Sequence, residues 1–235
     1  QRSIHARTLG QLGLSKTILF DIIMPDPSLP TEDQILAATI ETMGNVIVSG
    51  HIVYQNDRNH LVQPYPALLK AAAEFGITNV NNDADGLLRT HIPFRQTVQQ
   101  NVISLPLAAA NFLTGGQARI VSSKTHLTLS LNHREIPLSE RNEIFIHFPE
   151  TSFERYEYID VLTGKISPET FKDKTVVLGV AASGASDFYS IPSFPGARVI
   201  SGAEYNAWAL VALLWGDLPK RTPPIYTAIL CMISV

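Results

Sequence analysis

Asp21 is the acidic residue with the most unusual sequence context in this chain. It lies between Phe20 and Ile22 inside an otherwise apolar run, Thr17–Met24 (TILFDIIM). A carboxylate within an apolar strand is costly unless it is paired or hydrogen-bonded. The sequence leaves three roles open for Asp21: a buried or edge ion pair, which we favour, an acid that faces a ligand, and a catalytic acid.

A second group of candidate residues follows the apolar run Thr175–Val180 (TVVLGV). There a stretch of small residues, Gly179–Ser186 (GVAASGAS), ends at Asp187. Ligands bind at the carboxyl ends of strands in open α/β sheets, and backbone amides of such a loop can cradle an anion. The chain has no phosphate-binding loop, dinucleotide fingerprint or nucleophile elbow. We therefore expect Ser183 and Asp187 to serve packing or ligand contact, and not catalysis.

The segment Asn81–Gly86 (NNDADG) has oxygen-bearing side chains at alternate positions, as in the first half of a calcium loop. The position that should hold a bidentate Glu is Ile92, and Arg89 adds a positive charge. The favoured interpretation is a turn in which Asp85 and Gly86 supply the left-handed backbone, with a metal site as the alternative. The sequence predicts no metal and no cofactor.

The seven histidines show no spacing typical of metal or catalytic sites, so we expect surface or capping roles for them. A net charge of −3 from 18 basic and 21 acidic residues argues against nucleic-acid binding. With 45% apolar and 17% charged residues, the chain is not intrinsically disordered. These features point to a folded globular protein and argue against a disordered chain and a nucleic-acid-binding protein.

Alternating strands and helices must position these side chains. The spacing of apolar residues, prolines and glycines predicts strands and helices in β-α-β order, which favours α/β layering. The predicted strands include 17–24, 45–54, 77–80, 87–94 and 175–180, and the predicted helices include 31–43, 66–75, 102–113 and 202–214. Gly44 and Gly76 are expected to end the first two of these helices, and Asn132 and His133 are expected to form a turn. We predict one α/β domain over residues 1–219, with a mixed β-sheet and flanking helices.

Four segments together resemble one known family, the CHASE domain of the second class, a sensing module of bacterial receptors. The resemblance covers most of residues 10–219, and the segments that carry it are Phe20–Pro27 (FDIIMPDP), Asn79–Arg89 (NVNNDADGLLR), Lys172–Pro192 (KDKTVVLGVAASGASDFYSIP) and Phe194–Trp208 (FPGARVISGAEYNAW). Members pair an acidic motif in the first strand with a D-G-x-x-R motif. The resemblance therefore implies that Arg89 is the partner of Asp21.

The resemblance also implies a place for the chain in a receptor. It implies a sensor outside the inner membrane, on the periplasmic side, between transmembrane helices that lead to a cyclase, diguanylate cyclase or kinase. Residues 220–235, with the uncharged run Ile225–Val235, are then the start of a transmembrane helix. That run is shorter than the roughly 20 residues of a full span, and a short buried helix is the alternative.

The expected partners follow from this interpretation. They are a small-molecule ligand, the membrane and a second copy of the chain, and the sensor itself is expected to be non-catalytic. The ligand-contact candidates are Asp21, Asp85, Arg89, Ser183 and Asp187. Paired receptor helices also predict that the N-terminal arm Ser3–Leu14 and the last helix Gly202–Leu214 lie close together. The alternative is a free periplasmic α/β binding protein or hydrolase.

Overall fold

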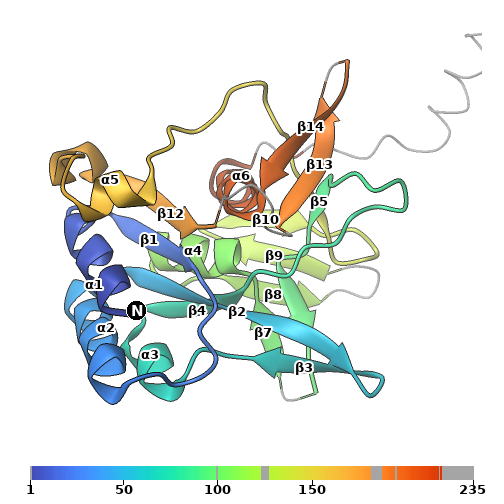
Figure 1. Ribbon diagram of the computed structural model, residues 1–235. Helices are drawn as coiled ribbons and strands as arrows, with labels where there is room; N and C mark the ends of the chain where they lie inside the picture. The colour runs from blue at the N-terminus through green and yellow to red at the C-terminus, as the bar shows by residue number, and fades with distance from the viewer. Residues whose placement is uncertain are drawn as a thin grey trace, which may run out of the picture.

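The computed structural model describes residues 2–98, 100–122, 127–180, 187–193, 195–216 and 218. A mixed sheet with the strand order β12-β1-β2-β3, in which β4 also pairs with β2, lies at its centre (Figure 1). Its strands are β1 (Thr17–Asp21), β2 (Val46–Gln55), β3 (Arg58–Val62), β4 (Glu74–Ile77) and β12 (Thr175–Gly179). Only β3 runs antiparallel to its neighbour. The predicted α/β class with a mixed sheet is confirmed.

Helices cover both faces of this sheet (Figure 1). One face packs against α1 (Arg2–Gln11), α2 (Pro30–Met43), α3 (Pro66–Ala71) and α5 (Tyr158–Leu162), and the other against α4 (Leu105–Leu113) and α6 (Gly202–Trp215). Successive residues of a strand point to opposite faces. In β1, Ile18 and Phe20 therefore join the first core, and Leu19 joins the second. The next residue on the second face is Asp21.

Smaller strands pack around this core. They are β5 (Thr90–His91), β6 (Phe94–Gln96), β7 (Asn101–Ile103), β8 (Arg119–Ser122), β9 (Leu127–Leu131), β10 (Arg134–Pro137), β11 (Ile144–Phe145), β13 (Phe188–Ser193) and β14 (Gly196–Ser201), with a 3₁₀ turn at Pro168–Phe171. The predicted turn at Asn132 and His133 is confirmed, because both residues have positive φ values, 47° and 61°. The β13–β14 hairpin was not foreseen in the sequence.

The helix predicted over residues 66–75 is shorter than expected. It ends at Ala71, because Glu74–Ile77 pairs with β2 as a parallel strand. A Cβ atom on Gly76 would lie 2.6 Å from the backbone of Leu105, so this glycine allows α4 to pack closely on β4 and is not a helix stop. By contrast, Gly44 ends α2 in the left-handed conformation as predicted, with a φ of 64°.

The expectation that the N-terminal arm and the last helix lie close together is wrong within one subunit. α1 and α6 pack against opposite faces of the central sheet (Figure 1). The helix predicted to enter the membrane, residues 220–235, lies outside the described residues. No helix within the described part of the chain has the length and apolar character needed to cross a membrane.

Candidate functional site

Asp21 is the last residue of β1 and faces α6. Its Oδ2 accepts a hydrogen bond of 2.9 Å from the Nδ2 of Asn206, in the second turn of α6. The expected ion pair with Arg89 is wrong, since the Arg89 guanidinium binds Asp83 and Asp85 instead. Asp21 therefore has a neutral hydrogen-bond donor where the sequence suggested a cation.

Asp187 lies on the same side of the sheet, against the first residue of α6. Its backbone carbonyl accepts a hydrogen bond of 3.0 Å from the amide of Gly202. A Cβ atom on Gly202 would overlap the Asp187 carboxylate, so the close approach requires glycine. The positive end of the helix dipole favours a carboxylate at this position. The Asp187 carboxylate also interacts with the Tyr189 hydroxyl on β13 and raises its pKa.

The two carboxylates interact electrostatically, and the pKa of Asp21 shows this. Burial raises the pKa of Asp21 to about 6, the Asn206 hydrogen bond opposes that shift, and the charge of Asp187 adds to it. Burial also raises the pKa of the Tyr189 hydroxyl, and the interactions with Asp187 and Asp21 add to this shift. In the described residues, no ion pair joins Asp21 or Asp187 to a Lys or Arg. We call Asp21, Asp187, Tyr189 and Asn206 the edge site.

The neighbours of Asp21 along the sheet are small. On one side the register pairs it with Gly179, where a Cβ atom would lie 3.4 Å from the Asp21 Cβ and 2.9 Å from the Ala203 Cβ. On the other side the pairing of Phe20 with Val48 makes Ser49 its neighbour on the same face. The Ser49 hydroxyl is fully buried and has no hydrogen-bond partner among the described residues. Polar groups without full partners thus gather at this edge of the sheet.

Asp85 and Arg89 belong to a different place, the turn Asp83–Arg89. The Arg89 guanidinium lies 2.6 Å and 2.9 Å from the two Asp85 oxygens and 2.7 Å from Asp83 Oδ2. Gly86 has a φ of 80°, which confirms the predicted turn. The hydrogen bonds from Arg89 lower the pKa of the exposed Asp85 to about 2. An open groove of about 540 Å³ runs beside this turn, lined also by Ser139, Glu140 and Arg141.

The structure therefore divides the five predicted site residues. Asp21 and Asp187 lie together at the edge site, and Asp85 and Arg89 neutralise each other in the turn. Ser183, with most of the small-residue loop, lies outside the described residues. Asn206 was missed, although an amide among the apolar residues of the last helix is the sequence signal that could have indicated it.

His91 was also misjudged, because surface or capping roles were expected for all histidines. It is 2% exposed, with Nδ1 2.7 Å from the Tyr205 hydroxyl on α6 and Nε2 2.8 Å from the Ser104 hydroxyl. Burial, with a smaller effect of Arg95, lowers the pKa of His91 to about 3, so the ring is neutral. Ser104 also caps α4 through the Leu107 amide. His91 thus links the start of α4 to α6 near the edge site.

Comparison with known proteins identifies the family. No curated protein and no solved structure is significantly similar to the chain. The family model of the CHASE2 domain matches residues 1–235, in agreement with the resemblance seen in the four segments. CHASE2 domains are sensory, generally non-catalytic and usually extracytoplasmic modules of membrane receptors. This chain belongs to the CHASE2 domain family.

Proposed function

We propose that this chain is the ligand-sensing input domain of a transmembrane signalling receptor and that the edge site is where the ligand binds. The observation that carries the assignment of the site is the meeting of Asp21 and Asp187 at the carboxyl ends of β1 and β12, without a cationic partner among the described residues. Ligands of open α/β sheets bind in this position. The receptor runs through the membrane from residue 220 onward to a cyclase, diguanylate cyclase or kinase.

The chemistry of the edge site selects the ligand class. Two carboxylates and the Tyr189 hydroxyl offer hydrogen-bond acceptors, and the buried Ser49 hydroxyl lies one strand away. Asp21 ionises at a cost because it is buried, and no Lys or Arg among the described residues compensates its charge. A protonated amine would supply that charge and the missing donors together. We assign the edge site to small cationic amines.

A thermal-shift experiment tests the site. Ethanolamine and putrescine, each compared with a carboxylic acid of the same size, are added to the 235-residue chain and to two variants. We expect an amine to raise the Tm of the wild-type chain and of the control Arg89→Gln, and not that of Asp21→Asn. The assignment fails if neither amine stabilises the wild-type chain, or if the stabilisation survives in Asp21→Asn.

The location of the domain can be tested separately. Cys231 is the only cysteine, and Tyr54 on β2 is 71% exposed, so a Cys231→Ser/Tyr54→Cys variant carries one accessible thiol. In the full receptor, an extracytoplasmic sensor reacts with a membrane-impermeant maleimide in intact cells. Reaction only after lysis would place the domain in the cytoplasm and contradict the receptor topology.

A further inference from the structure

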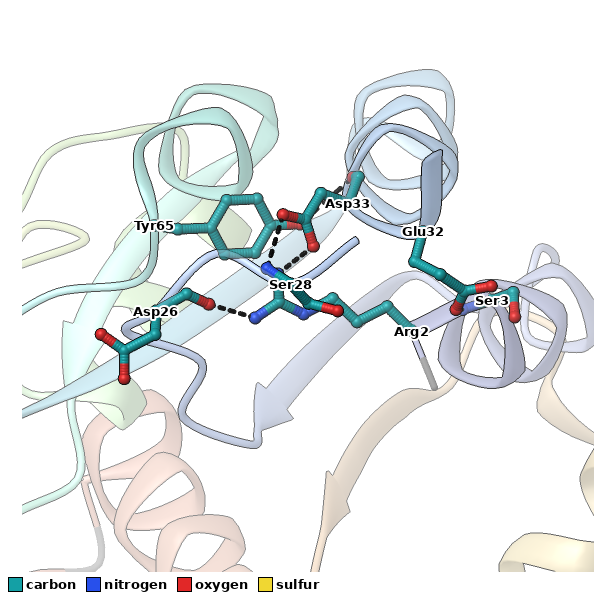
Figure 2. A network of polar contacts seen from close by, with 7 residues as sticks. All are labelled: Arg2, Ser3, Asp26, Ser28, Glu32, Asp33 and Tyr65. Carbon is teal, nitrogen blue, oxygen red and sulfur yellow. Dashed lines mark hydrogen bonds and ion pairs between the residues drawn. The ribbon is translucent and has the colours of Figure 1, made fainter. Parts of the chain in front are cut away.

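Arg2 is nearly buried although it lies in the first turn of α1. Its side chain and that of Asp33, in the first turn of α2, are each 12% exposed and form an ion pair. The guanidinium also lies over the ring of Tyr65, 4.3 Å from its centroid, and donates to the backbone carbonyl of Asp26 (Figure 2). A single side chain of α1 therefore contacts α2, the residue that precedes α3, and the connection between β1 and α2.

The partners of Arg2 are themselves fixed. Asp33 accepts a hydrogen bond of 2.9 Å from the Ser28 amide through its second carboxylate oxygen, and its backbone carbonyl accepts one from the Tyr65 hydroxyl (Figure 2). The Tyr65 amide donates to the Met24 carbonyl at 2.9 Å. Breaking a buried ion pair leaves an uncompensated charge, which is more destabilising than losing an exposed pair. Arg2 is thus the centre of a connected polar network.

That network holds the loop that leaves the edge site. Residues 22–29 connect Asp21 to α2 and form no helix or strand. Their contacts include the Met24 carbonyl with Tyr65, the Asp26 carbonyl with Arg2, and the Ser28 amide with Asp33. The loop therefore follows Asp21, which is hydrogen-bonded to Asn206 of α6, and its Asp26 carbonyl is held by Arg2 of α1.

α1 depends on such contacts for its position. It has ten residues, includes Gly10 and has no acidic residue in its first turn. Isolated helices shorter than about 12–15 residues are marginal in water, so packing decides whether this one stays in place. The Ser3 amide of α1 donates to the Glu32 carboxylate of α2 at 2.7 Å, and a further long-range hydrogen bond joins His5 Nδ1 to the Tyr158 hydroxyl on α5 at 2.9 Å, away from the loop. The contact between His5 and Tyr158 provides a matched control.

We propose that Arg2 is a latch that couples the loop 22–29 to α1, so that a change at Asp21 alters how firmly the N-terminal helix is docked. α1 and α6 lie on opposite faces of the sheet, and the path from Asn206 through Asp21 and the loop to Arg2 joins them along the end of β1. The latch rests on the proposed function only in treating α1 as an element that reports binding.

Hydrogen exchange on the 235-residue chain tests the latch. Arg2→Gln should speed amide exchange at least about tenfold both in α1 and in the loop 22–29, since both lose a shared buried partner. Tyr158→Phe should speed exchange in α1 and leave the loop unchanged. Arg7→Gln, a change at an exposed position of the same helix, should alter neither.

Coupling is measured by combining variants. Asp21→Asn should change exchange in α1 when Arg2 is present, and this effect should vanish in Asp21→Asn/Arg2→Gln. Arg2→Lys keeps the charge without the forked geometry of the guanidinium and should retain part of the effect. The test therefore does not depend on Arg2→Gln alone, the variant in which α1 is most destabilised. The latch is refuted if Arg2→Gln leaves the loop unchanged, or if Asp21→Asn acts on α1 equally without Arg2.

These results are independent of ligand binding. An amine that stabilises the chain, together with an Asp21→Asn variant that leaves α1 unchanged, supports the edge site and refutes the latch. Coupled exchange without any amine effect supports the latch and refutes the ligand class.

Discussion

The edge site and the Asp83–Arg89 turn both bring two carboxylates together, but they balance the charge in opposite ways. In the turn, the partly exposed Arg89 binds both acids, and its hydrogen bonds lower the pKa of Asp85 to about 2. At the edge, Asp21 and Asp187 lie near each other, no Lys or Arg among the described residues pairs with either, and burial raises the pKa of Asp21 to about 6. Arg89 balances the charge of the turn locally, whereas the proposed amine ligand would balance the charge of the edge site.

The largest effect should come from removing the Asp21 charge. The pKa of Asp21 is about 6 in the folded chain against 3.8 for the free side chain. Protonated Asp21 therefore contributes to the free energy of unfolding below pH 3.8, relative to neutral pH, and this contribution is lost as pH rises through 6. Asp21→Asn can still accept the Asn206 hydrogen bond and should be about 3 kcal/mol more stable than wild type near pH 8. Urea unfolding of both proteins across this range measures the difference.

The difference between the two proteins should shrink toward zero below pH 4, where Asp21 is protonated in both the folded and the unfolded chain. His91 contributes the opposite pH dependence, because its lowered pKa makes the fold lose stability as pH falls below 6.5. Only the difference between variant and wild type isolates Asp21. A pH-independent difference would show that Asp21 is not the strained carboxylate.

Removing the neutral donor should have the next largest effect. Asn206→Leu leaves the ionised Asp21 without its bond from α6, which should cost about 1–3 kcal/mol near pH 8. The loss should be smaller at pH 5, since a protonated carboxyl needs the donor less. The Asp21 pKa, followed by carboxyl carbon chemical shifts, should rise further. A fall of that pKa would mean that Asn206 does not stabilise the anion.

A smaller shift should follow from neutralising Asp187. The charge of Asp187 contributes to the raised pKa of Asp21, but less than burial does. In Asp187→Asn the Asp21 pKa should therefore fall while staying above 3.8, measured by the same carbon shifts. The Tyr189 pKa should fall as well, since Asp187 raises it. An unchanged Asp21 pKa would show that the two acids do not interact electrostatically, and the two would then not form one shared site.

The smallest effect should be that of Arg89→Gln. The Arg89 pairs are partly exposed, and exposed ion pairs contribute little and are screened by salt. The pKa of Asp85 should rise toward its usual value, with the unfolding midpoint changing little, and not at all in high salt. Measuring the Asp85 pKa and the unfolding midpoint at low and at high ionic strength tests this prediction. A large salt-independent loss of stability would show that the turn, not the edge, holds the strained charge.

Features encoded within a few residues were predictable. The apolar runs of β1, β2 and β12, the left-handed Gly44 and the Asp85–Gly86 turn were all predicted, because neighbouring residues decide them. The unusual position of Asp21 was also visible, since a charge in an apolar run stands out. What the sequence determined by itself is the α/β class and the carboxylates that needed an explanation.

The partners of those carboxylates were decided by the tertiary structure. Asp21 meets Asn206, which is 185 positions away, while Arg89 is taken by acids four and six positions from it. Which distant groups meet depends on strand order and on which face each helix covers, and no local pattern contains that information. The same reason explains why α1 and α6 pack against opposite faces, and why Arg2 became the buried link between α1 and the loop from Asp21.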